Sequence, residues 1–160
     1  MAIHKLYIDE IDEVDFQLIA IHTSLEDYRL AYFLNQKLPI LLGKSKNAIQ
    51  INNKEGVNHF SKYLFEDVEN NRYWNLIQNK NEKTTLKNDN SENLFANITL
   101  EVTTKVYFLQ ELKKVDYFLK IENSGLEMEA IISQLNTIEK ITTLYEIDVL
   151  RIKSKHNLIF

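Results

Sequence analysis

The stretch VDFQLIAIH at residues 14–22 decides the fold class, because it is an apolar, β-rich run with the length of a strand. Thr23 and Glu26 follow it at the spacing of a capping box, in which the side chains satisfy free amides at the start of a helix. Apolar residues then recur at helical spacing until Pro39. This region therefore predicts a buried strand followed by a capped amphipathic helix.

A second strand–helix pattern lies 101 residues further along the chain. Residues 14–38 align with residues 115–139 without a gap, and seven of the 25 aligned positions are identical. The capping-box spacing recurs at Ser124 and Glu127, where a second helix is predicted over about 125–139. The match fits an internal duplication. It also fits convergence of two strand–helix units, because geometry dictates their apolar positions and caps.

The region between the two units predicts mainly β structure. After Pro39, residues 40–51 fit a strand or a bent pair of strands. The aromatic-rich segments 60–66 and 72–78 predict a hairpin, because the Asn-Asn pair between them tolerates the positive φ of a tight turn. A helix over residues 57–68 is the alternative, since apolar residues there have near-helical spacing.

Residues 79–93 contain Leu86 as their only apolar residue, so we expect a mobile loop there. Strand character returns in four later segments, at residues 98–102, 106–109, 115–122 and 141–149.

These elements predict an α+β fold in a single domain over residues 1–160. We expect a single, mainly antiparallel sheet with two helices on one face, because right-handed crossovers put both helices on the same side. This is the ferredoxin-like or ACT-like pattern, with an internal strand–helix repeat and an inserted aromatic hairpin.

Composition excludes several classes of function. The chain has no cysteine, which excludes disulfides, thiolate metal sites and cysteine nucleophiles. Its three glycines are too few for a Walker loop or a G-x-G-x-x-G turn, and we expect no cofactor. The net charge is −4 and the basic residues are spread out rather than clustered to bind a phosphate backbone, so we expect no DNA partner. Without an apolar run of membrane-spanning length or a signal-peptide pattern, we expect a cytoplasmic protein that makes no membrane contact.

The segment LQELKKVDY at residues 109–117 resembles the signature of the IPExxxVDY family of bacterial proteins. Four residues match the motif: Glu111, Val115, Asp116 and Tyr117. Leu109 stands in place of the family's isoleucine and Gln110 in place of its proline. The aromatic hairpin is also similar to that family. Because the family has no assigned activity, the resemblance implies kinship without a mechanism.

Glu111, Asp116 and Tyr117 are candidates for acid–base chemistry, because two carboxylates beside a phenol could move protons if burial shifted their pKa values. A structural role is favoured, since Asp116 has a repeat partner in Asp15, and residues at equivalent strand starts commonly fix register or accept backbone amides. An enzyme would require Asp15 and Asp116 to converge in one cleft. We therefore predict no catalytic residue and a structural role for Glu111, Val115, Asp116, Tyr117 and Asp15.

His22 is a candidate binding residue, because it lies where the first strand passes to its helix, an edge at which α/β sheets commonly bind ligands. None of the four histidines has the short-range His, Asp or Glu neighbours typical of a metal site. We expect no metal.

Tyr73 and Trp74 are further candidate binding residues, together with Phe60, Tyr63 and Phe65 in the same aromatic region. A sheet that exposes such side chains can stack RNA bases. Since the region has no basic groove, core packing is the favoured interpretation.

The leading functional hypothesis is a non-catalytic binding or regulatory module that engages a protein partner or a small ligand. The first alternative is an RNA-associated accessory protein that uses the aromatic hairpin. The second is an enzyme with Glu111 and Asp116 as acid–base residues. A homodimer is compatible with the pattern, because strand–helix units of this size often pair edge to edge.

Overall fold

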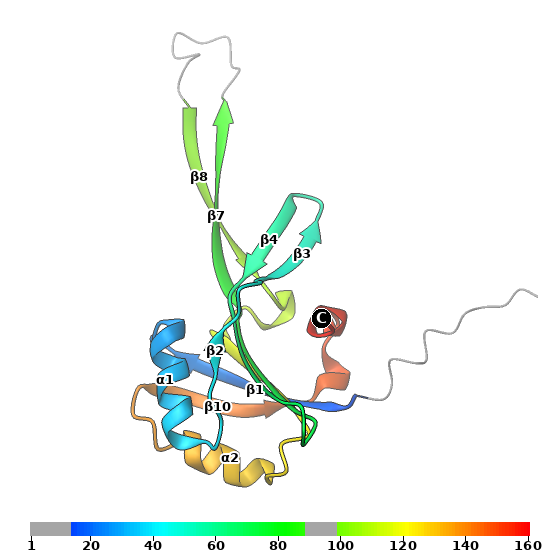
Figure 1. Cartoon of the computed structure of the whole chain (residues 1–160). Helices are drawn as coiled ribbons and strands as arrows, with labels where there is room; N and C mark the ends of the chain where they lie inside the picture. Colours follow the sequence, from blue (N-terminus) through cyan, green and yellow to red (C-terminus); the bar gives the residue numbers. More distant parts are fainter. Residues whose placement is uncertain (1–13, 89–98) are drawn as a thin grey trace, which may run out of the picture.

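The computed structural model describes residues 14–88 and 99–160. Its centre is an antiparallel sheet (Figure 1). The sheet has six strands in the order β10-β1-β9-β6-β5-β2. In that order, the strands span Ile141–Ile147, Phe16–Thr23, Tyr117–Glu122, Arg72–Gln78, Lys62–Asp67 and Gly43–Lys44. The predicted α+β class with a mainly antiparallel sheet is confirmed.

The apolar run at residues 14–22 forms β1, which strands flank on both sides. Leu18 pairs with Lys120 of β9 on one side and with Ile147 of β10 on the other. Residues 18–21 have no exposed surface, because side chains from other elements also cover both faces of the strand. A strand buried on both faces needs apolar residues at successive positions, which explains the continuous run.

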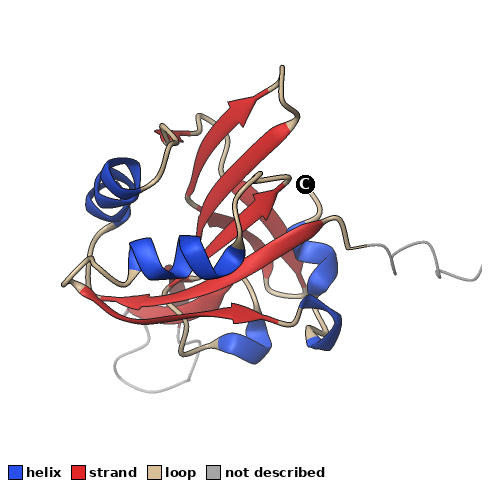
Figure 2. Ribbon diagram, turned by 90° about the horizontal axis from the view of Figure 1, so that it is seen from below, coloured by secondary structure: helices blue, strands red, loops and turns tan. Residues whose placement is uncertain are grey.

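Two helices, α1 (Asp27–Lys37) and α2 (Met128–Leu135), lie on the same side of the sheet (Figure 2). Leu34 of α1 and Leu135 of α2 belong to one core cluster with the residues of β1 and β9 that point to this side. The second helix is shorter than the predicted 125–139. No helix in the described part of the chain is long and apolar enough to cross a membrane.

Three short helical turns and the C-terminal segment cover the opposite face of the sheet. The turns are η2 (Gln110–Leu112), η3 (Val149–Arg151) and η4 (Lys155–Leu158). Leu18 of β1 and Phe118 of β9 point to this side and pack in a second core cluster with Phe108, Val149 and Leu158. The sheet therefore lies between two apolar layers, one helical and one irregular.

Two further sheets of two strands each stand outside the main sheet, which corrects the prediction of a single sheet. One pairs β3 (Ile49–Asn53) with β4 (Gly56–Phe60). The other pairs β7 (Lys80–Asn88) with β8 (Thr99–Tyr107) and projects away from the main sheet (Figure 1). We call β7 and β8 together the arm.

The arm overturns the prediction of a mobile loop over residues 79–93. Residues 80–88 pair with residues 99–107 in an unbroken register, and residues 89–93 lie outside the described residues. Low apolar content suggested a loop, but Thr84 and Thr85 are β-branched and favour strands without being apolar. The two strands predicted at 98–102 and 106–109 form a single strand, β8.

The predicted aromatic hairpin is confirmed, and the alternative helix over residues 57–68 is wrong. Strands β5 and β6 pair antiparallel from Asp67 and Arg72 to Lys62 and Ile77. Asn71 has a φ of 55° in the turn between them, the left-handed conformation that asparagine tolerates better than most residues.

The predicted capping boxes are wrong, although their first residues have equivalent roles. Glu26 and Glu127 are the N-cap residues, and neither side chain caps its helix. Thr23 Oγ1 and Ser124 Oγ instead accept hydrogen bonds from the N–H groups two residues further on, at 3.2 and 3.1 Å. Both side chains therefore close a turn between strand and helix.

The two aligned segments, 14–38 and 115–139, are both strand–turn–helix units, but their aligned strand residues point to opposite faces of the sheet, since Leu18 lies in the second core cluster and Leu119 in the core on the helix side. Their strands, β1 and β9, are antiparallel neighbours at the centre of the sheet. Each strand leads through one of these turns to a helix on the same side of the sheet.

Candidate functional site

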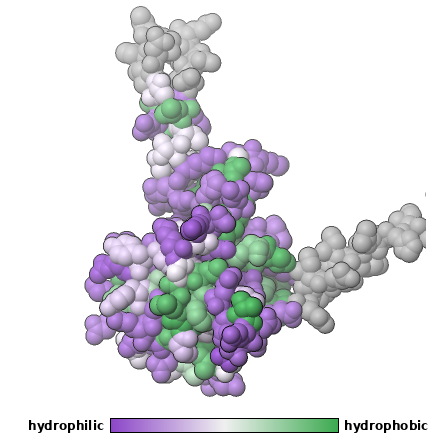
Figure 3. All heavy atoms as spheres, viewed as in Figure 1, coloured by the Kyte–Doolittle hydropathy of each residue, from purple (hydrophilic) through white to green (hydrophobic). Residues whose placement is uncertain are grey.

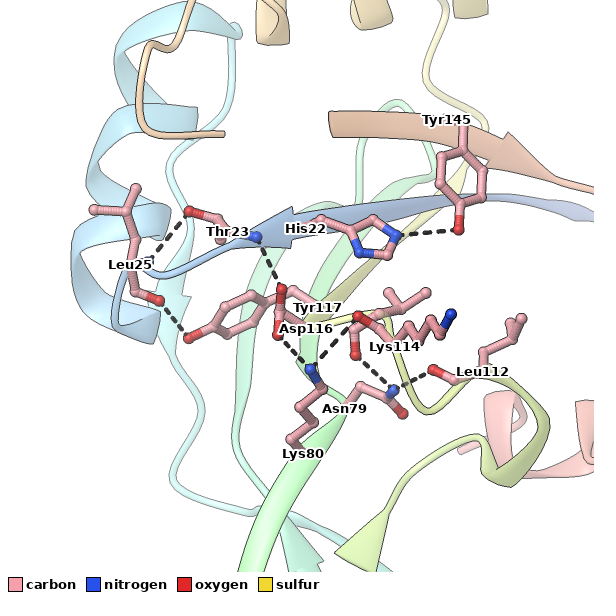
Figure 4. A network of polar contacts seen from close by, with 11 residues as sticks. His22, Thr23, Leu25, Asn79, Lys80, Leu112, Lys114, Asp116, Tyr117 and Tyr145 are labelled. Atoms are coloured by element: carbon pink, nitrogen blue, oxygen red, sulfur yellow. Dashed lines mark hydrogen bonds and ion pairs between the residues drawn. The ribbon is translucent and has the colours of Figure 1, made fainter. Parts of the chain in front are cut away.

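Polar contacts are concentrated where β9 begins, in the segment that carries the family-like motif (Figure 4). We call residues 109–116, which join β8 to β9, the motif loop. Asp116 ends it. Its Oδ2 accepts a hydrogen bond from the Thr23 N–H at 2.9 Å, and its Oδ1 lies 2.7 Å from Lys80 Nζ. The Asp116 carboxylate thus connects the end of β1 to the first residue of the arm.

Tyr117 begins β9 and points into the core on the helix side. Its hydroxyl donates a hydrogen bond to the Leu25 carbonyl at 2.8 Å. Burial, and then the charges of Asp27 and Asp116, raise the pKa of Tyr117 above its ordinary value. The phenol therefore stays neutral and holds the turn between β1 and α1, which makes it a poor proton donor near neutral pH.

Glu111 holds the C-terminal segment against the motif loop. Its carboxylate accepts hydrogen bonds from the Ser154 N–H at 2.8 Å and from the Ser154 hydroxyl at 2.6 Å. Partial burial acts to raise the pKa of Glu111, but the hydrogen bonds from Ser154, together with those from the Glu111 and Lys153 backbone, lower the pKa below its usual value. Val115, the other motif residue, is buried in the second core cluster.

Asn79 completes this network, although its sequence region predicted a mobile loop. It is fully buried, and its Nδ2 donates to the carbonyls of Leu112 and Val115 at 2.9 and 2.7 Å. Its Oδ1 accepts from the Leu109 N–H at 2.9 Å. One side-chain amide therefore holds both ends of the motif loop. The sequence offers no signal for this role, because an asparagine between two strands is also typical of a turn.

His22 lies near the end of β1, where the sequence predicted it. Its Nε2 is 3.1 Å from the hydroxyl of Tyr145 on β10 (Figure 4). The two rings are tilted, with centroids 5.6 Å apart. The pair leaves a polar, partly exposed surface near the β10 edge of the sheet.

The carboxylates of Asp15 and Asp116 do not converge in one cleft. Asp15 precedes β1 and Asp116 precedes β9, and these strands run antiparallel. The length of β1 therefore separates the two residues by about 20 Å. Glu111 and Asp116 also have no hydrogen-bond partner in common, because Glu111 binds Ser154 while Asp116 binds Thr23 and Lys80.

The aromatic residues of the hairpin region do not form one exposed platform. Trp74 and Tyr63 are buried in the core on the helix side, and Phe60 is buried on the opposite side. Tyr73 is partly exposed and precedes Trp74 in β6, so it points to the opposite face. Phe65 packs against the core on the helix side.

Two hollows lie beside this network. Gln78, Lys80, Asn81, Glu82 and Lys105 line one at the base of the arm. The motif loop, β10 and η3 line the other. Both are open to solvent and carry charges of both signs, unlike the enclosed apolar pockets that hold small ligands. Within residues 14–88 and 99–160, no three His, Asp or Glu side chains are grouped to hold a metal ion.

Comparison with known proteins gives no relative, because no family model, no curated protein and no solved structure matches this chain. The resemblance to the IPExxxVDY family therefore rests on the motif residues, which the structure finds tied into hydrogen bonds and core packing.

Proposed function

We propose that this protein is a non-catalytic binding or regulatory module that engages a protein partner through the arm. The exposure of the arm carries the proposal. Of residues 80–87 and 99–107, only Val106 is buried. The other side chains of the arm are at least partly exposed and contribute little to the core. The fold therefore gains little stability from the nine residue pairs of the arm, which project into solvent.

A two-stranded hairpin is marginally stable in water, and it gains stability when a further strand or a surface packs against it. The arm is mainly hydrophilic (Figure 3). Its exposed apolar side chains, Leu86 and Leu100, lie far from its base in the register of the two strands. Its edges carry backbone N–H and C=O groups to which an extended peptide can add as a strand. A protein segment in extended conformation is the ligand that suits this surface.

The base of the arm is held in a fixed position. Asn79 accepts a backbone hydrogen bond from Phe108 at 2.8 Å, and Lys80 pairs with Asp116. On the side of β4, Asn81 donates to the His59 carbonyl at 2.6 Å, and Lys83 donates to the Glu55 carbonyl at 2.9 Å. The motif loop thus serves as an anchor that fixes the direction of the arm, which lowers the entropic cost of binding.

We further propose that β10, β1, β9 and β6, with the two helices, form a ferredoxin-like, ACT-like core that arose by duplication. Their order and antiparallel pairing support this. The sequence match also extends upstream, since IDEIDEVDF at residues 8–16 aligns with LQELKKVDY at residues 109–117. Residues 8–13 lie outside the described residues. The polar identity Glu10/Glu111 is not required by a buried strand, which favours duplication over convergence.

The alternative functions have less support. An enzyme that uses Glu111 and Asp116 would need these carboxylates free and close together, but both are occupied by separate partners. A role in RNA binding would need exposed aromatic faces, but Phe60, Tyr63 and Trp74 are buried. A gel shift with mixed RNA at low salt tests this second alternative.

The test of the proposal is to shorten the arm and measure partner capture. Joining Glu82 to Lys105 through an Asn-Gly turn removes the outer arm, because these two residues already pair directly. We expect the intact protein to capture a partner from native lysate and the shortened protein to lose it, with an unchanged thermal midpoint. Equal capture by both proteins would show that the arm is not the binding element.

A further inference from the structure

We propose that β10 is a homodimer interface, where the sheets of two copies of this chain join edge to edge. In the described part of the chain, β1 is the only strand beside β10. The other edge of β10 therefore offers a row of backbone N–H and C=O groups to a further strand. This interaction goes beyond the proposed function, because it does not involve the arm.

Most of β10 lacks the features by which proteins protect a sheet edge from pairing. Its sequence, ITTLYEI, has no lysine, arginine or proline. Its ladder with β1 is regular from Ile147 to Thr143, and the register shifts only beyond this stretch, at Thr142. The opposite edge of the sheet differs. There β2 has two residues, Gly43 and Lys44, and the lysine lies 3.8 Å from Asp27. The molecule protects one edge with a short, charged strand and leaves the other long and nearly uncharged.

The sequence of β10 favours a second copy of the same strand as its partner. Antiparallel pairing about a two-fold axis at Leu144 places Thr142 opposite Glu146 of the second copy. Glu146 is the only charged residue of the strand, and in this register it faces a neutral threonine. Parallel pairing would place each Glu146 beside its own copy, where like charges repel.

The side chains around the edge suit this arrangement. Thr142, Thr143 and Glu146 are exposed, and Tyr145 is 43% exposed. Each Tyr145 would pack beside Thr143 of the second copy, and aromatic side chains pair favourably with β-branched ones across strands. Because α2 packs next to β10 in the core on the helix side, the two α2 helices would lie on the same side of the joined sheet.

Oligomeric state and two opposite charge changes test the interface. Size exclusion with light scattering, run over about a hundredfold range of protein concentration, should give the mass of a dimer. Thr142→Glu places two pairs of like charges across the joint, so we expect a dissociation constant about threefold to tenfold higher. Thr142→Lys places an ammonium opposite each Glu146 and should lower the constant by a similar factor. Thr103→Lys, at an exposed position on β8, is the control and should change nothing.

Disulfide cross-linking tests the register. The chain has no cysteine, so the introduced thiols are the only ones present. Thr142→Cys combined with Glu146→Cys places thiols opposite each other twice in each dimer, whereas either single variant leaves its thiols apart. We expect the double variant alone to form covalent dimers under oxidation. A monomer at every concentration, two Thr142 variants that change the constant in the same direction, or equal cross-linking of the single variants would each overturn the proposal.

Discussion

The strands β1 and β9 are antiparallel neighbours inside the sheet, but the residues that precede and begin them have different contacts. Asp116 binds Thr23 and Lys80, and Tyr117 binds the turn before α1. At the equivalent positions before and in β1, Asp15 is exposed and makes no side-chain hydrogen bond to the described residues. Phe16 has no hydroxyl, and its ring lies 4.7 Å from Lys120 Nζ.

The additional contacts before β9 indicate the role of the polar motif. The motif loop connects the arm to β9, and it must be held against β1, the arm and the C-terminal segment at once. Asp116 binds β1, Asn79 holds the loop against the start of the arm, and Glu111 binds the C-terminal segment. The motif is therefore best explained as an anchor, and changing its residues should affect stability far more than changing their counterparts in the first unit.

The largest effect is expected for Asn79→Ala. The change leaves the Leu109 N–H and two carbonyls without their partner in a buried site, which should cost on the order of 3 kcal/mol or more. Urea denaturation measures the loss. Asn136→Ala is the control, because Asn136 is exposed and makes no side-chain hydrogen bond within the described residues. A loss below about 1 kcal/mol for Asn79→Ala would contradict the anchor role.

The next effect compares the equivalent aspartates. Asp116→Ala leaves the Thr23 N–H without an acceptor and frees Lys80, so we expect a loss of about 1–2 kcal/mol. Asp15→Ala should change the free energy of unfolding by less than about 0.5 kcal/mol. Thermal and urea denaturation of both variants measure the difference. Equal losses would mean that the two strand starts are energetically alike.

Tyr117→Phe makes the second unit resemble the first at this position. Removing the hydroxyl leaves the Leu25 carbonyl unpaired in the core, at a cost of about 1 kcal/mol. Because burial raises the pKa of the folded Tyr117 above its unfolded value, its contribution is complete below about pH 10 and falls as the pH rises further. Stability of the unmodified protein should therefore decline more steeply above that pH than stability of Tyr117→Phe. Tyr28→Phe, at an exposed position on α1, should keep the steeper decline.

The smallest effect is expected for Glu111→Gln, and it depends on pH. Despite partial burial, hydrogen bonds from Ser154 and from the Glu111 and Lys153 backbone keep the pKa of folded Glu111 below its unfolded value. The contribution of Glu111 is therefore present above about pH 4.3 and is lost as the pH falls through the folded pKa. Urea midpoints between about pH 6 and pH 3 should fall less for Glu111→Gln than for the unmodified protein. The exposed Glu129→Gln variant serves as the reference, and an identical acid profile for all three proteins would exclude the role.

Much of the main sheet could be predicted from the sequence. The run at residues 14–22 and the aromatic segments before and after Asn71 became strands as expected, because local pattern and tertiary burial agree there. The arm could not be predicted in the same way. Its residues are polar, and its strands pair across the gap between residues 88 and 99, so local apolar content gives no signal for a ladder.

The two strand–helix units follow from local patterns of residues, since continuous apolar runs demand burial on both faces and helical spacing demands one buried side. The roles of the polar residues depend on contacts between distant parts of the chain. Asp15 and Asp116 are aligned in the sequence, but only Asp116 has a backbone amide and a lysine within hydrogen-bond distance among the described residues. The physical reason is that a hydrogen bond needs a partner within about 3 Å, and partners distant in sequence are brought that close only by the packing of the whole chain.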